Sequence, residues 1–264
     1  MKKMIMILVI VFFFINSQTV YGETEHHWNN LNNLTETALQ LAKQNRFEDS
    51  SHLIVYFKEQ FENKPGIQSE LSADDIRTVS LTHTHALEAL QNKTMGDSEK
   101  IRAVTQFRLV VDAMNSEYDP LWSSMEDSVM NVFSQIKTDV ESGNYESFQE
   151  QWNEFLIMYE MIYPSVSVDV DSQIIKRVDS HISTIDNRLF DQMSDSTKEQ
   201  HISQMEEDLR TLFDRAEEDE SDPSLLWVII STGSIIILSL SYAGFRKYQG
   251  EKERRKQRDR ETNK

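Results

Sequence analysis

Histidines are the first residues of this chain whose type could support chemistry, because imidazole binds metals and exchanges protons near neutral pH. His83 and His85 are two residues apart, so on a helix their side chains point about 160° from each other and cannot share a metal ion. His83 falls on an apolar helical face, which indicates a hydrogen-bonded core histidine. His26 and His27 follow a predicted leader segment, and we expect them in a mobile terminus.

Carboxylates are abundant, and two of them could act as general acid and base, as in glycoside hydrolysis. The run Asp169-Val170-Asp171-Ser172 resembles the start of a calcium loop but lacks the glycine and the late glutamate of that motif. The sequence contains no HExxH, no phosphate loop, no GxSxG and no cysteine. We therefore expect no enzymatic activity, no metal and no cofactor. The alternative is an extracytoplasmic enzyme that acts on cell-wall material through paired carboxylates.

One charged pair stands inside an apolar run. Residues 107–114, FRLVVDAM, are nearly apolar all round, which is typical of a helix buried on most sides. Arg108 and Asp112 are four residues apart, so they can pair on one helix face. We predict a buried ion pair there, which would be costly to break. The other hypothesis is that this pair anchors a partner.

The segments that must position these residues are helical. Between residues 23 and 216, Gly and Pro are few and apolar residues recur at helical spacing, which predicts an all-α domain of about eight helices. Asp119 is predicted to be an N-cap, with Pro120 as the first helical residue. Other predicted boundaries are Lys64-Pro65-Gly66, a capping box at residues 72–75, Ser142-Gly143-Asn144 and Pro164.

The helical region contains a possible internal repeat. Two halves, 23–117 and 118–216, superpose without gaps at an offset of 98 residues, which places Phe57 on Phe155 and His83 on His181. Apolar positions and helix breaks also coincide. This pattern favours two tandem four-helix halves. The alternative is that the match arises by chance, because any two amphipathic helical segments of similar length can be aligned at some offset.

Both ends of the chain carry membrane signals. Residues 1–22 combine Lys2 and Lys3 with an apolar run, which predicts a signal peptide cleaved after Gly22 or, alternatively, an uncleaved anchor. Residues 225–245 hold 21 uncharged residues, long enough for a transmembrane helix. The predicted membrane anchor residues are Leu225, Trp227, Tyr242 and Phe245, with the two aromatic rings near the interfaces.

The middle of the chain is acidic and its C-terminal tail is basic. Residues 23–222 hold 16 Lys/Arg against 40 Asp/Glu, and the acidic segment 217–224 is predicted to be a linker. The tail 246–264 holds 9 Lys/Arg against 4 Asp/Glu, which places it in the cytoplasm and the acidic domain outside a single-pass cell-membrane helix. Such an acidic domain would repel nucleic acid. The predicted contacts to anionic lipid are Lys252, Arg254, Arg255, Lys256 and Arg258.

Several short motifs, spread over most of the chain, occur in an order that is typical of one protein family. They are the signal segment, RFEDS at 46–50, FRLVVDA at 107–113, DPLW at 119–122, IYP at 162–164 and the C-terminal anchor. In their order and spacing they resemble the YpjB family of sporulation proteins. The resemblance implies a sporulation-associated membrane protein without a known activity. We expect a structural or protein-interaction role, with membrane lipid and another extracytoplasmic or membrane protein as partners.

Overall fold

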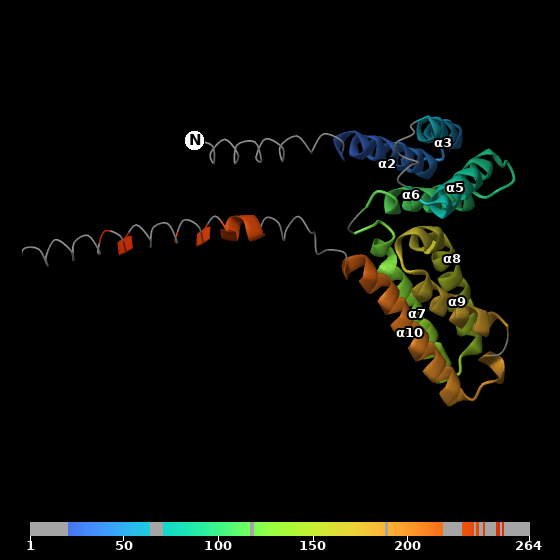
Figure 1. Cartoon of the computed structure of the whole chain (residues 1–264). Coiled ribbons are helices and arrows are strands. Elements are labelled where there is room, and N and C mark those ends of the chain that lie inside the picture. Colours follow the sequence, from blue (N-terminus) through green and yellow to red (C-terminus); the bar gives the residue numbers. More distant parts are fainter. Residues whose placement is uncertain are drawn as a thin grey trace, which may run out of the picture. The chain divides into compact units, whose positions relative to one another are not determined.

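The computed structural model describes most of the helical region (Figure 1). The described residues are 21–63, 71–116, 119–187, 190–218, 229–234, 236–237, 240, 247–248 and 250. The chain divides into two units, residues 1–218 and 219–264. In the first unit every described element is a helix and none is a strand, so the prediction of an all-α domain is confirmed.

In the described part of the first unit, each half supplies four α-helices. The first half contains α2 (Tyr21–Lys43), α3 (Phe47–Glu62), α5 (Ala73–Gln91) and α6 (Asp97–Ala113). The second half contains η1 (Ser123–Met125), α7 (Glu126–Ser142), α8 (Tyr145–Asp169), α9 (Ser172–Asp186), η2 (Phe190–Gln192) and α10 (Asp195–Glu218). His26 and His27, expected in a mobile terminus, lie within α2 instead.

The helices of the two halves pack in the same order. In the first half α2 packs on α3 and α6, and α5 packs on the same two helices. In the second half α7 packs on α8 and α10, while α9 packs on α10 and touches α8 only slightly. The looser contact between α8 and α9 is the main departure from the shared arrangement.

The turn that joins the first two helices of each half is also repeated at the offset of 98 residues. Asn45 has a φ of 61° and Gly143 has a φ of 68°, so both adopt the left-handed conformation that ends a helix. The aromatic residue after each turn is covered by a lysine from the fourth helix of the same half. Lys100 Nζ lies 4.6 Å from the ring centroid of Phe47. Lys198 Nζ lies 4.8 Å from that of Tyr145.

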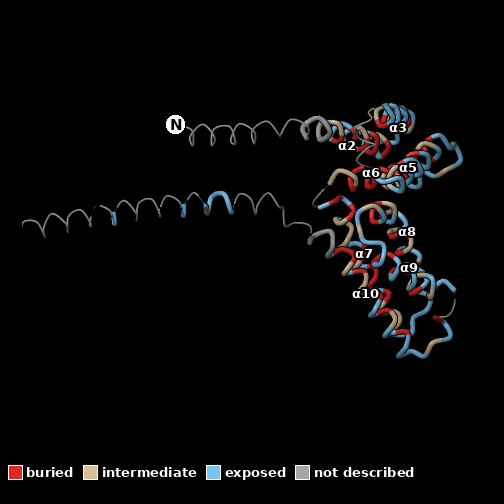
Figure 2. The backbone as a smooth tube through the Cα atoms, in the orientation of Figure 1, coloured by how far each residue is buried: buried red, intermediate tan, exposed pale blue. Residues whose placement is uncertain are grey.

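Helix α6 belongs to both hydrophobic cores. Val104 and Phe107 pack into the core of the first half, whereas Leu109 and Ala113 pack into that of the second. Ten of the 17 residues of α6 are buried, so the prediction of a helix buried on most sides is confirmed. In α10, by contrast, buried positions alternate with exposed ones, as expected of a helix on the surface (Figure 2).

Local sequence signals set several helix ends. Ser72 Oγ accepts from the Asp75 N–H at 3.1 Å, and the Asp75 carboxylate accepts from the Ser72 N–H at 2.9 Å, which confirms the predicted capping box. Asn144 caps α8 by accepting from Ser147 N–H at 3.5 Å. Asp171 accepts from Gln173 N–H at 2.7 Å, so this residue of the calcium-like run serves as the N-cap of α9.

The prediction of a helix that begins at Pro120 is wrong. Asp119 has a φ of 50° and residues 119–122 form a turn, so α7 begins only at Glu126. Two long-range bonds hold the turn: Leu121 N–H donates to Asp112, and the indole of Trp122 donates to Asp169 at 2.7 Å. Trp122 is fully buried, and burial of so large an aromatic side chain outweighs a local capping preference.

The prediction that Pro164 ends its helix is also wrong. Helix α8 continues through Pro164 to Asp169. Proline removes one helical hydrogen bond, which costs about 3 kcal/mol in a helix interior. Ile162 and Val166 on either side are fully buried, and their packing keeps the segment helical.

The structure describes only part of the predicted membrane segment, residues 229–234, 236–237 and 240. Among the described residues, no helix combines the length and the apolar character needed to cross a bilayer. Residues 1–20 and the predicted anchor residues Leu225, Trp227, Tyr242 and Phe245 lie outside the described residues. The same is true of Lys252, Arg254, Arg255, Lys256 and Arg258.

Candidate functional site

The structure brings Arg108 and Asp112 together. The Nη1 of Arg108 lies 3.3 Å from the Oδ1 of Asp112, and both residues are buried. Arg108 also reaches α2, where it donates to Asn32 at 3.1 Å and to Glu36 at 3.3 Å. The pKa of Glu36 is lowered, mainly by a hydrogen bond from Gln40 and also by Arg108. These contacts fix α6 against α2.

Asp112 extends the same cluster to the second half. Its Oδ2 accepts the backbone N–H of Leu121 at 2.7 Å and the hydroxyl of Ser116 at 3.3 Å. The carboxylate therefore holds the turn that leads into the second half, in addition to pairing with Arg108. Because both side chains are buried and bonded to α2 and to the turn at Leu121, the pair is a structural element of the fold.

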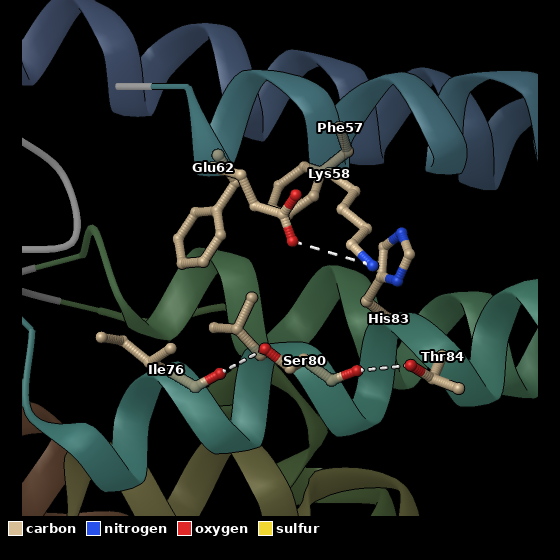
Figure 3. Close-up of a pocket in the computed structure, with 9 residues that line it drawn as sticks. Phe57, Lys58, Glu62, Ile76, Ser80, His83 and Thr84 are labelled. Atoms are coloured by element: carbon tan, nitrogen blue, oxygen red, sulfur yellow. Dashed lines mark hydrogen bonds and ion pairs between the residues drawn. The ribbon is translucent and has the colours of Figure 1, made fainter. Parts of the chain in front are cut away.

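A narrow cleft lies between α3 and α5, with a volume of about 160 Å³ (Figure 3). His83 faces it and is 6% exposed; its Nε2 lies 2.9 Å from the Ile54 carbonyl, which confirms the predicted core histidine. Burial lowers the pKa of His83. Lys58 pairs with Glu62 at 3.7 Å, and both side chains project from α3 over the cleft (Figure 3).

A larger hollow, the α8–α9 groove, lies between α8 and α9. Its main part has a volume of about 700 Å³, and a second hollow of about 390 Å³ shares Leu156 and Asp186 with it. The main part is lined by Gln106, Leu156, Tyr159, Glu160, Tyr163, Pro164, Asp179, Ile182, Ser183, Asp186 and Asn187. The second hollow adds Phe148, Gln149, Trp152, Asn153, Ile185, Phe190 and Asp191. Each of these volumes falls in the range of about 300–1,000 Å³ that is typical of ligand sites.

A row of aromatic rings runs along α8 beside the groove. Trp152 stacks on Phe155 with ring centroids 5.2 Å apart, Phe155 on Tyr159 at 5.9 Å, and Tyr159 meets Tyr163 at 5.6 Å. Trp152, Phe155 and Tyr159 are buried, whereas Tyr163 is 38% exposed, so Tyr163 is the ring of this row that a ligand can contact.

The polar tips of this row meet carboxylates of α9. Tyr159 donates to Asp179 at 3.0 Å, Tyr163 donates to its other oxygen at 3.3 Å, and Trp152 donates to Asp186 at 3.0 Å. Burial, followed by the charge of Asp179, raises the pKa of both tyrosines. Both hydroxyls therefore remain protonated donors near neutral pH.

The groove is acidic. Glu160, Asp179, Asp186 and Asp191 line it, and no Lys or Arg is among the lining residues that the structure describes. Among the described residues, none of these four carboxylates forms an ion pair, whereas Glu206 and Asp208 on α10 do. Glu160 also lines a separate, smaller hollow, and Arg102 of α6 is among the other residues that line it.

The two hollows occupy equivalent places in the two halves. At the offset of 98 residues, Lys58 corresponds to Leu156 and Glu62 corresponds to Glu160. The glutamate that is paired in the first half is therefore retained in the second without its lysine. Phe61 and Thr84 correspond to Tyr159 and Ile182. The second half thus presents a wider hollow in which leucine stands at the position of the first-half lysine.

Sequence reasoning missed the groove and one histidine pair. Tyr159 and Tyr163 on α8, like Asp179 and Asp186 on α9, are spaced to share a helix face, and that double periodicity was the available signal. His181 Nδ1 lies 3.3 Å from His201 Nε2, and its Nε2 lies 3.1 Å from Asp208. Burial and the neighbouring His181 lower the pKa of His201. Among the described residues, no group of His, Cys, Asp and Glu is arranged to hold a metal ion.

Comparison with known proteins decides the family. The family model described as "Sporulation protein YpjB" matches residues 28–257. The chain belongs to the YpjB family of sporulation proteins. A member from Bacillus subtilis (strain 168), named "Uncharacterized protein YpjB", is 38% identical over 260 residues, which cover 98% of each chain. No solved structure matches the chain. The YpjB resemblance noted from the motifs is confirmed, and with it the association with sporulation.

Proposed function

We propose that this YpjB family member is a single-pass membrane protein whose extracytoplasmic helical domain docks another protein in the α8–α9 groove during sporulation. Its role is structural and non-enzymatic. Support for docking comes from the groove itself, which is wide, aromatic on one wall and acidic on the other. Asp179 and Asp186 accept hydrogen bonds from the opposite wall, which fix the positions of both carboxylates in the groove.

The membrane part of the proposal rests on the sequence. Residues 225–245 contain no charged side chain, and Arg246 and Lys247 follow directly. Positive charge on the cytoplasmic side would place the helical domain outside. The tail residues Lys252, Arg254, Arg255, Lys256 and Arg258 would then lie along anionic lipid, each contributing about 1 kcal/mol.

One observation carries the docking role: the second half keeps Glu160 but replaces the lysine of the equivalent first-half position with Leu156. A surface that needs only to stay soluble would gain from an internal pair there. A docking surface gains instead from charges that are free for a partner.

Chemical crosslinking of the full chain in sporulating cells tests this role. We expect adducts with a partner protein from the original chain and from Lys58→Leu, which alters only the α3–α5 cleft. Leu156→Lys should lose the same adducts, because the new lysine would occupy the groove and pair with Glu160. Adducts that persist unchanged in Leu156→Lys would contradict docking in the groove.

A further inference from the structure

We infer that the occupant of the α8–α9 groove is a basic, amphipathic polypeptide segment, with one of its Lys or Arg side chains bound at Asp179 between Tyr159 and Tyr163. This inference rests on the proposed docking function and specifies the chemistry of the partner. The groove supplies three things that select such a segment: negative charge without a cation among the described residues, the partly exposed ring of Tyr163, and apolar side chains.

The charge selects a cation. The four carboxylates that line the groove form no ion pair among the described residues, and residues 23–222 as a whole carry 40 acidic against 16 basic side chains. Phosphate groups and anionic lipid would be repelled. Opposite charge would draw a basic segment in and set its register.

The site at Asp179 fits an ammonium or guanidinium group. Both of its oxygens already accept phenol hydroxyls, at 3.0 Å from Tyr159 and 3.3 Å from Tyr163, so the carboxylate is fixed while its charge is not neutralised by any described Lys or Arg. The raised pKa of each tyrosine keeps these hydroxyls as donors. The partly exposed Tyr163 ring lies beside this carboxylate.

The protein uses the same chemistry internally. Lys198 Nζ lies 4.8 Å from the ring centroid of Tyr145 and donates to its hydroxyl at 2.9 Å. Lys100 lies over Phe47 in the same way. In the α3–α5 cleft, Lys58 supplies the cation for Glu62, and Leu156 stands at the equivalent position of the groove. A lysine or arginine of the partner would replace the missing one.

The length and the apolar wall select a polypeptide over a small cation. Asp179 and Asp186 are seven residues apart on α9, which separates them by about 10.5 Å along the helix. Leu156 and Ile182 lie between the polar groups as partly buried apolar contacts. A helix with basic residues two turns apart and leucine-like residues on the same face fits both features.

Peptide binding to the full chain, held in nanodiscs of uncharged phosphatidylcholine, tests the inference. The probe is a fluorescent helical peptide of leucine and lysine, compared with one peptide in which glutamate replaces lysine and another in which serine replaces leucine. Only the leucine–lysine peptide should bind, and added salt should weaken its binding. Equal binding of the glutamate or the serine peptide, or no binding of any peptide, would overturn the inference.

Variants assign the binding to the groove. Asp179→Asn, which keeps the size of the side chain, and Leu156→Lys should each weaken binding about tenfold or more, equivalent to about 1.4 kcal/mol. The control Lys58→Leu should bind as the original chain does, and the far-ultraviolet melting curve of each variant verifies folding. Unchanged binding by both groove variants would overturn the assignment.

This test is separable from that of the docking function. Crosslinks through the groove in cells, together with no preference for the leucine–lysine peptide, would show that only the proposed chemistry of the partner is wrong. The peptide preference without groove-dependent crosslinks would show instead that the docking role in the cell is wrong.

Discussion

The side-chain amide of Gln106 in α6 donates a hydrogen bond of 2.8 Å to the backbone carbonyl of Glu160 in α8. This is the carbonyl that would accept from residue 164 in a regular helix, and Pro164 has no N–H to offer. Gln106 also accepts from His85 Nδ1 at 3.2 Å. A side chain of the first half therefore supplies the bond that proline removes from the second.

The role of Gln106 can be measured by a double-mutant cycle with Pro164. Gln106→Leu should cost about 1 kcal/mol of unfolding free energy, because the Glu160 carbonyl loses its donor. In a Pro164→Ala background the same change should cost much less, because the alanine supplies a backbone N–H that donates to this carbonyl. Denaturant unfolding followed by circular dichroism measures both costs. Equal costs in the two backgrounds would contradict this assignment.

Asp112 should be among the residues whose loss is most destabilising. Asp112→Ala should lower the unfolding free energy by about 3 kcal/mol, because the Leu121 N–H loses its acceptor and buried Arg108 keeps only the half-exposed carboxylate of Glu36. The double change Arg108→Met with Asp112→Leu should cost less, although the Leu121 N–H still loses its acceptor. Denaturant midpoints provide the comparison.

The second half contains a matched control for this prediction. Glu206 and Arg210 stand at the positions equivalent to Arg108 and Asp112, and they pair at 3.0 Å with Arg210 56% exposed. Arg210→Ala should cost no more than about 1 kcal/mol, because exposed ion pairs contribute little. Similar costs for Asp112→Ala and Arg210→Ala would show that burial of the first pair is unimportant.

Acidification should destabilise the fold through His83 and His201. Burial lowers the pKa of both from the ordinary value of 6.5, so the unfolded chain binds more protons than the folded chain just below that pH. Stability is therefore full above pH 6.5 and declines as the pH falls from there to the lowered folded pKa values. Glu36 and Glu206 contribute only at lower pH, because their pKa values are lowered from 4.5.

The melting temperature, measured as a function of pH, tests the predicted loss of stability on acidification. His83→Gln, which keeps a donor for the Ile54 carbonyl, and His201→Gln should each reduce the decline between pH 6.5 and about pH 5. A melting temperature that rises on acidification in this window would contradict the assignment.

Membrane orientation can be tested with single cysteines, because the chain has none of its own. Gln135→Cys, at an exposed position of α7, should react with an impermeant thiol reagent in intact protoplasts. Lys264→Cys should react only after the membrane is opened. Labelling of Lys264→Cys alone in intact protoplasts would reverse the proposed orientation.

Local signals in the sequence predicted much of the helical fold. The capping box at Ser72 and Asp75, the turn at Gly143 and the buried face of α6 each depend on residues close in sequence, so their patterns were readable. The errors at Asp119 and Pro164 arose where contacts from distant residues override a local preference. Trp122 bonds to Asp169, and Gln106 bonds to Glu160, across 47 and 54 residues.

The groove was harder to predict for the same reason. In the sequence, Tyr159 and Tyr163 could be assigned only to an apolar helix face. Nothing distinguished Asp179 from the rest of the 40 acidic residues outside the tail. Only packing shows that Tyr159 and Tyr163 converge on Asp179 and that α9 stands away from α8. The 98-residue offset then shows that Leu156 of the groove is the counterpart of Lys58 in the α3–α5 cleft.

Site-specific photocrosslinking in sporulating cells tests docking in the groove most directly. A photoreactive amino acid would replace Ile182 in the α8–α9 groove or, as the matched control, Thr84 at the equivalent position of the α3–α5 cleft. We predict a discrete protein adduct from position 182, absent from position 84 and lost when Leu156→Lys is added. The same adducts from both positions, or an adduct at 182 that survives Leu156→Lys, would contradict the account.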